Sequence, residues 1–97
     1  MKLIKLIFLI HFLVFGNFTI SQENLDSLFG VWNDESKADT SRLNAMYNIA
    51  WNGYLFTKPD SAFYYAQLEY EFAQKVDNKN YMSHALNTQG VSFYLKS

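Results

Sequence analysis

The sequence predicts an all-α fold. Apolar residues recur at the i, i+3, i+4, i+7 spacing of one buried helix face, and no stretch shows the period-two alternation of a half-buried strand. Residues 45–55 (AMYNIAWNGYL) and 85–95 (ALNTQGVSFYL) also read as two copies of one helix, offset by 40 positions. Periods of this size are typical of helical-repeat proteins, whose units bury their apolar faces by stacking on one another.

Residues 1–21 have the pattern of a secretory signal peptide. A basic start is followed by a nearly all-apolar stretch over residues 6–15, and Thr19 and Ser21 supply small residues before a cleavage point. We expect this segment to be cleaved, which makes the mature protein exported, either periplasmic or extracellular. The alternative is an uncleaved membrane anchor, because residues 3–20 are almost long enough to span a bilayer.

The mature part, residues 22–97, is short and weakly acidic. It holds six of the eight Lys and Arg residues and all nine Asp and Glu residues, which gives a net charge of −3. Nucleic-acid binding is not expected, because it requires clustered Lys and Arg. The chain has no Cys, so this exported segment cannot rely on disulfides. Its stability must come from helix packing.

A short lead helix is predicted over residues 24–33, followed by a polar linker, so that the lead region covers residues 22–38. Its apolar residues follow helical spacing: Leu25, Leu28, Phe29 and Trp32. We expect this helix to cover the open face of the helix pair that follows.

A first helix pair is predicted over residues 39–80. Its first helix runs over about residues 42–56 and its second over 59–76, because Pro59 suits a first helical turn and cannot lie in a helix interior. Gly53 is a poor helix former, and its presence inside the first helix indicates that a neighbouring helix approaches closely there.

A further helix over residues 81–97 reads as the first helix of a second, incomplete repeat. We expect its inner stripe to consist of Ala85, Leu86, Gly90, Phe93 and Tyr94. We also expect further repeats downstream, so that this chain is the opening of a longer protein. An alternative is a short exported protein that oligomerises through this helix.

No catalytic, metal or cofactor site is expected. His84 is the only His of the mature part, and zinc sites require three or four ligands. Glu69 and Glu71 stand two positions apart on one helix, so they point away from each other and cannot share an acid–base site. We expect both to be solvated, or paired with a base such as Lys75. The Ser residues lack a nucleophile-elbow context, and no glycine-rich phosphate loop is present.

The predicted helices resemble the tetratricopeptide repeat, a helix-turn-helix unit of about 34 residues. The matching positions are the small residues and the aromatic at fixed places in the unit: Ala50, Ala62, Gly90 and Phe93. The departures are the residues where the family has Trp in the first helix and Ala in the second: Met46, Leu86 and Glu69. The spacing of 40 positions is similar to that of the longer-helix variants of the family.

The resemblance implies a function in protein–protein or peptide binding. In this family, polar side chains of the first helix of each unit line a concave groove that holds a peptide. The corresponding candidates here are Asn48, Asn52 and Asn87, with Asn48 and Asn52 four positions apart on one helix face. The alternative is that these amides bond nearby backbone or water. Three aromatic residues either face a partner or form the packing surface for a further repeat: Trp51, Tyr64 and Tyr70.

A second resemblance concerns the whole exported segment. Its Trp32–Asn33–Asp34 turn and the stretch from Asp39 to Leu43 are similar to the N-terminal sensor region of certain bacterial signalling proteins. In those proteins, exported tetratricopeptide repeats precede a membrane helix and a cytoplasmic output domain. The alternative function is therefore the sensory part of a membrane-bound histidine kinase or nucleotide cyclase.

Overall fold

The computed structural model describes residues 20–97, and this part of the chain is all-helical. Its elements are α2 (Gln22–Asn33), α3 (Asp39–Asn48), the π-helical segment η1 (Ile49–Tyr54), α4 (Pro59–Lys75) and α5 (Lys79–Lys96). The predicted all-α class is therefore confirmed. The expected signal peptide lies outside the described residues except for Ile20 and Ser21. No helix between residues 20 and 97 combines the length and the hydropathy needed to cross a membrane.

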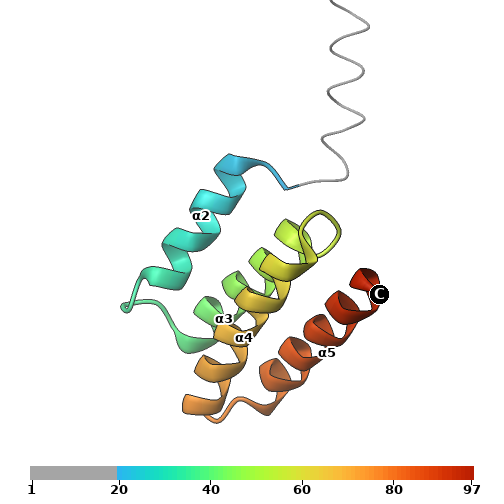
Figure 1. Ribbon diagram of the computed structural model, residues 1–97. Helices are drawn as coiled ribbons and strands as arrows, with labels where there is room; N and C mark the ends of the chain where they lie inside the picture. The colour runs from blue at the N-terminus through green and yellow to red at the C-terminus, as the bar shows by residue number, and fades with distance from the viewer. Residues whose placement is uncertain (1–19) are drawn as a thin grey trace, which may run out of the picture.

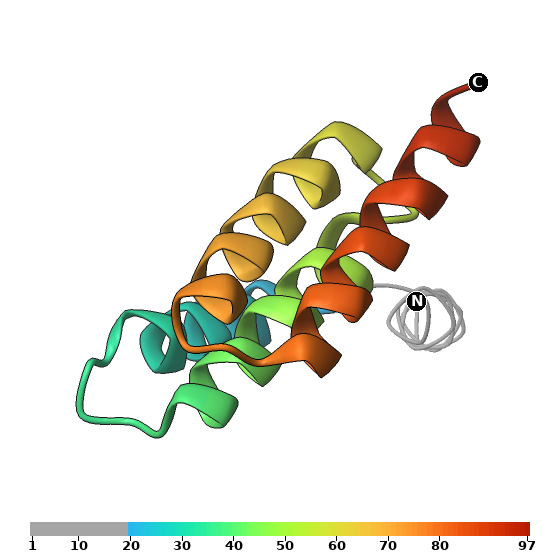
Figure 2. The same ribbon diagram turned by 90° about the horizontal axis from the view of Figure 1, so that it is seen from below.

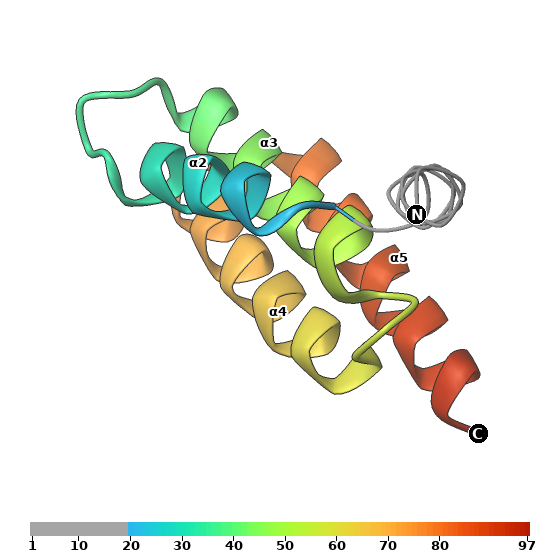
Figure 3. The same ribbon diagram turned by 90° about the horizontal axis from the view of Figure 1, so that it is seen from above.

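The helices form a layered arrangement around the pair made by α3 and α4. Figure 1 shows α2 on one side of this pair and α5 on the other. Seen from below, α4 and α5 run side by side over most of their length (Figure 2). Seen from above, α2 lies against the start of α3, away from α5 (Figure 3). Tight turns join α3–η1 to α4 and α4 to α5, so consecutive helices run antiparallel.

Local sequence signals explain where the helices begin and end. Pro59 is the first residue of α4, as predicted. The end of α4 closes with Asp77 in the left-handed region at φ 55°. Asn78 N–H donates to the Ala73 carbonyl at 2.8 Å, and Asp77 N–H donates to Gln74 at 3.2 Å. This pattern is a Schellman motif, which satisfies carbonyls that a helix end leaves free. Asn78 then caps α5 by accepting from Tyr81 N–H at 3.1 Å.

The first helix of the predicted pair differs from expectation in one respect. It begins at Asp39 as an α-helix and continues from Ile49 to Tyr54 as a π-helix. Gly53 lies in this widened segment. A Cβ at Gly53 would lie 2.9 Å from Leu25 Cδ2, so α2 packs directly against the bare backbone. The close helix approach predicted at Gly53 is confirmed.

The apolar core lies where α2 covers α3, η1 and α4. Leu25, Met46 and Ile49 form its centre. Partly buried side chains surround them: Ile20, Leu28, Phe29, Trp32, Tyr54, Tyr65 and Leu68. The lead helix thus covers the following pair, as predicted.

Arg42 fastens α2 to the pair from the side. Its Nε donates to the Trp32 carbonyl oxygen at 2.9 Å. Its guanidinium carbon lies 4.5 Å from the Phe72 ring centroid and 5.5 Å from that of Trp32. The two rings also meet edge to face, with their centroids 5.3 Å apart. Cation–π contacts of this kind contribute more when they are shielded from water.

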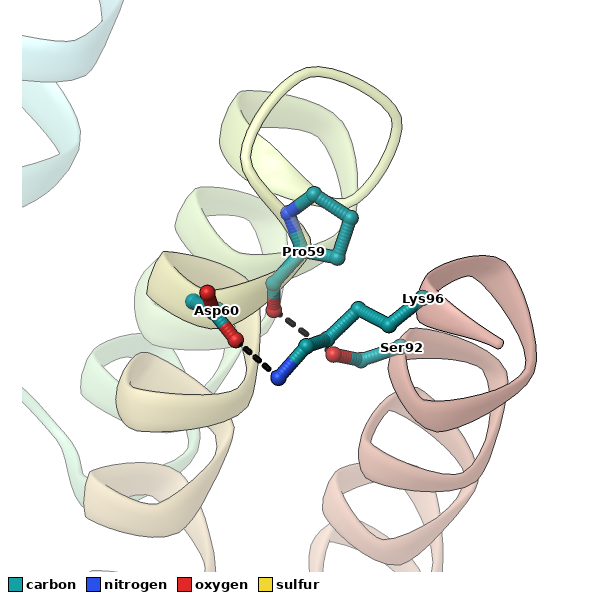
Figure 4. Close-up of polar contacts among 4 residues, drawn as sticks. All are labelled: Pro59, Asp60, Ser92 and Lys96. Atoms are coloured by element: carbon teal, nitrogen blue, oxygen red, sulfur yellow. Dashed lines mark hydrogen bonds and ion pairs between the residues drawn. The ribbon is translucent and has the colours of Figure 1, made fainter.

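The α4–α5 interface is built from small and polar side chains. The buried residues of α4 are Ala62, Ala66, Glu69 and Ala73, and those of α5 are Ala85, Thr88, Gln89 and Ser92. Polar bonds hold the C-terminal half of α5. Gln89 Nε2 donates to Gln67 Oε1 at 2.8 Å. Ser92 Oγ donates to the Pro59 carbonyl at 2.6 Å, and Lys96 pairs with Asp60 (Figure 4).

The predicted inner stripe of α5 is wrong except for Ala85. Leu86, Phe93 and Tyr94 are 53%, 69% and 79% exposed. Gly90 is exposed, and a Cβ built on it would meet no atom within 4 Å. The reason is that α5 packs on the alanine stripe of α4 through the face that contains Ala85, Thr88, Gln89 and Ser92. The large apolar residues lie outside that face.

Burial nevertheless follows the offset of 40 positions on one helix face. Ala45 and Ile49 are buried, and so are their counterparts Ala85 and Gln89. On a second face the two copies differ. Leu43, Met46 and Ala50 are fully buried, whereas their counterparts Ser83, Leu86 and Gly90 are exposed. The difference arises because α3 lies between α2 and α4, while α5 is packed on one side only among residues 20–97.

Candidate functional site

A continuous row of rings crosses from the turn after η1 to α5, over η1 and α3. Its members, in spatial order, are Phe56, Trp51, Tyr47, His84 and Tyr81, which we call the aromatic row. Successive ring centroids lie 6.3, 6.2, 5.2 and 5.5 Å apart. Phe56 is 70% exposed, His84 is exposed, and the other rings are half-buried. The row therefore presents ring surface to solvent along two helices.

Helical spacing builds each half of the row. Tyr47 and Trp51 are four positions apart, and their rings stack with an interplanar angle of 17°. Tyr81 and His84 are three positions apart in the first turns of α5. The turn after α4 returns the chain beside α3, so that His84 meets the Tyr47 ring edge to face at 67°. His84 and Tyr81 belong to the row only because α5 is packed in this position.

A ladder of asparagine side chains runs beside the row. Asn44, Asn48 and Asn52 follow one another at four-residue spacing, and we call them the asparagine ladder. Asn48 Nδ2 donates to the Asn44 carbonyl at 2.8 Å, and Asn52 Nδ2 donates to Asn48 Oδ1 at 2.7 Å. Tyr81 Oη donates to Asn44 Oδ1 at 3.3 Å, which joins the ladder to the row.

The structure thus brings together two of the three predicted groove asparagines. Asn48 is half-buried beside a shallow hollow of about 260 Å³, which is also lined by Ile20, Asn24, Ser27 and Leu28. Asn52 is exposed and keeps further bonding capacity on its amide. Asn87 is exposed on α5, three positions after His84, and no hydrogen bond within the described part of the chain links it to the ladder.

Sequence reasoning missed several members of this surface. Tyr47, Tyr81 and His84 meet only across the α3–α5 contact, which no local pattern reveals. Trp51 was a candidate partner-facing aromatic and belongs to the row. The other two candidates lie on α4, where Tyr64 is 59% exposed and Tyr70 is half-buried.

Glu69 contradicts its predicted environment. The carboxyl group was expected in solvent or beside a base, but Glu69 is fully buried and neither oxygen has a hydrogen-bond partner among residues 20–97. Burial raises its pKa from 4.5 to about 8. Glu71, two positions on, is exposed and accepts from Gln67 Nε2 at 3.3 Å. The physical reason is that α5 covers the stripe of α4 that contains Glu69.

The aromatic row and the asparagine ladder offer side chains that suit binding to another molecule. Rings offer apolar area that loses little conformational entropy on binding, and amides bond to peptide groups. In the described part of the chain, no cluster of three or more His, Asp or Glu side chains could hold a metal ion. Comparisons with family models, with curated proteins and with solved structures found no match. Function is therefore inferred from the geometry of this surface.

Proposed function

We propose that this chain is an exported, non-catalytic helical-repeat segment of tetratricopeptide type that binds a peptide segment of another protein. The observation that carries the proposal is the aromatic row beside the asparagine ladder. The row spans α3, η1 and α5, so a bound peptide would contact both copies of the first-helix pattern. A binding groove in a repeat protein is made in the same way, from equivalent helices of successive units.

The burial pattern supports the repeat interpretation. The face of α3 and η1 that contains Met46 and Ala50 is covered by neighbouring helices, and the equivalent face of α5 exposes Leu86 and Gly90. In a longer array this face of α5 would pack against the next helix. Further repeats are therefore part of the proposal.

The surface favours a neutral, apolar peptide. The row and the ladder contain no Asp, Glu, Lys or Arg. Ring edges and faces accommodate proline or aromatic side chains, as in grooves that recognise extended proline-rich segments. Asn52 would bond the peptide backbone with its free amide groups, while Asn48 holds Asn52 in position.

Binding assays with three sets of synthetic peptides test the proposal. One set is neutral and rich in Pro and Phe, one is acidic and one is basic. We expect the neutral set to bind, and Trp51→Ala to weaken its affinity about tenfold or more, the usual effect of losing a central aromatic. Tyr64→Ala is the matched control, because Tyr64 is an exposed aromatic outside the row.

The asparagines are tested by the Asn48→Ala and Asn52→Ala double variant. It should weaken binding of the same neutral peptides without altering the far-UV circular dichroism spectrum. If the double variant and Trp51→Ala both bind every peptide as the unaltered chain does, the assignment of the binding surface is wrong.

A further inference from the structure

Glu69 lies at a structural junction that controls the aromatic row. It belongs to the buried stripe of α4, between Ala66 and Ala73, where α4 packs against α3 on one side and α5 on the other. Its side chain is fully buried, and both carboxyl oxygens are without a hydrogen-bond partner in the described structure. An unpaired carboxylate in such a place is costly, whereas a neutral carboxyl group is tolerated much better.

Among residues 20–97, Glu69 forms no salt bridge with a cationic side chain. The titratable side chains of α3, η1 and α5 that contact α4, or that contact a residue lying against α4, are Arg42, Tyr47, Tyr54, Tyr81, His84 and Lys96. Arg42 is bonded to the Trp32 carbonyl, and Lys96 pairs with Asp60 at the far end of α4. Only burial shifts the pKa of Glu69.

Tyr81 connects Glu69 to the row. Burial raises the pKa of the Tyr81 phenol, and the nearby Glu69 carboxylate raises it further. The same Tyr81 donates to Asn44 and lies with its ring centroid 5.5 Å from that of His84. Glu69 therefore lies under the end of α5 that completes the row.

We propose that Glu69 is a pH-sensitive latch: its protonated carboxyl group keeps the first half of α5 packed, and its ionisation releases Tyr81 and His84 from α3. The role of the latch in ligand binding rests on the proposed function of the row. Release is confined to the first half of α5, because Gln89, Ser92 and Lys96 hold the second half to α4.

The sign of the effect follows from proton linkage. When α5 is released, Glu69 is solvated and titrates near its ordinary pKa of 4.5, whereas in the packed state its pKa is about 8. The packed state thus binds one more proton between these values. Packing is strongest below pH 4.5, weakens as the pH rises, and stops weakening above about pH 8. An acid with a lowered pKa would show the opposite dependence.

Amide hydrogen exchange of the full chain tests the latch without any ligand. Between pH 6 and pH 8, after correction for intrinsic exchange, protection at the amides of residues 82–88 should fall by up to about tenfold per pH unit. Glu69→Gln should remove this dependence. Glu71→Gln, an exposed carboxyl group on the same helix, should retain it. A flat profile in the unaltered chain, or an unchanged profile in Glu69→Gln, would overturn the proposal.

A direct titration covers the case in which Glu69→Gln does not fold. The carboxyl carbon of Glu69, followed by NMR in the unaltered chain, should titrate near pH 8 together with the amide shifts of Tyr81 and His84. A midpoint near 4.5 would refute the latch. Because neither measurement uses a peptide, a latch that operates in a chain that binds no peptide would refute only the proposed function.

Discussion

The same substitution, Gly to Ala, should have opposite effects at two helical positions. Ala is favoured over Gly inside a helix by about 1 kcal/mol. At Gly90 the new Cβ would meet no atom within 4 Å, so we expect Gly90→Ala to raise the free energy of unfolding by about 0.5–1 kcal/mol. At Gly53 the Cβ would lie 2.9 Å from Leu25 Cδ2, in the centre of the apolar core. Overpacking of this kind costs about 1–3 kcal/mol, which exceeds the helical gain.

We therefore expect the two variants to differ in stability by about 2 kcal/mol, with Gly53→Ala below the unaltered chain. Urea unfolding followed by far-UV circular dichroism measures the stability of both variants. If the unfolding free energy depends on urea concentration with the same slope in both, the two stabilities can be compared directly. Leu25→Ala provides a further check, because Gly53→Ala should cost less in a chain that already lacks the Leu25 side chain. If Gly53→Ala stabilised the chain as much as Gly90→Ala does, the packing of α2 on η1 described above would be refuted.

Further predictions concern single positions. Between pH 4.5 and about pH 8 the free energy of unfolding should fall as the pH rises, by at most about a tenfold increase in the unfolding equilibrium constant per pH unit, and Glu69→Gln should abolish the fall. Urea unfolding across this range measures the fall, and a stability that does not change with pH would contradict the prediction. Asp77→Gly should stabilise by about 1 kcal/mol in the same assay, because φ is 55° there, and a loss of stability would count against the αL cap. Ser92→Ala should lower the free energy of unfolding by about 1 kcal/mol, because it removes the hydrogen bond to the Pro59 carbonyl oxygen. Thermal unfolding measures this loss, and an unchanged unfolding midpoint would show that the bond contributes nothing.

The helix positions could be predicted from the sequence because the signals are local. Apolar spacing located α2, and Pro59 fixed the start of α4. Gly53 indicated a close approach without identifying which helix approaches. The π-helical turn of η1 was not predicted, since apolar spacing is read at α-helical period.

The packing of α5 could not be predicted from its hydrophobicity. Apolar spacing favoured Leu86 and Phe93 as inward residues, yet the face that fits the alanine stripe of α4 contains Thr88, Gln89 and Ser92. Small polar side chains allow a close approach and then bond across the interface. The pattern of apolar residues does not indicate which face of α5 packs on α4, because steric fit to α4 determines that face.

In the candidate site too, features set by local spacing could be predicted, and features set by the packing of α5 could not. The asparagine spacing placed Asn48 and Asn52 side by side on one helix face, but it did not predict the hydrogen bond between their side chains. The meeting of Tyr47 with His84 depends on the position of α5 and was not predicted. The environment of Glu69 had two available signals: helical spacing places Glu69 among the inward residues of α4, and the tetratricopeptide resemblance implies Ala at this position. Hydropathy alone favours solvent for any Glu.

The exposed face of α5 and the buried Glu69 are thermodynamically coupled. A helix that packs on Leu86 needs the first half of α5 to be packed, so its binding stabilises the packed state by mass action. The packed state is the one in which Glu69 is protonated. A partner on this face would therefore shift the opening of α5 to higher pH, and ionisation of Glu69 would in turn weaken the partner's affinity. Because both effects act on the first half of α5, the aromatic row would sense the pH and the occupancy of the neighbouring face together.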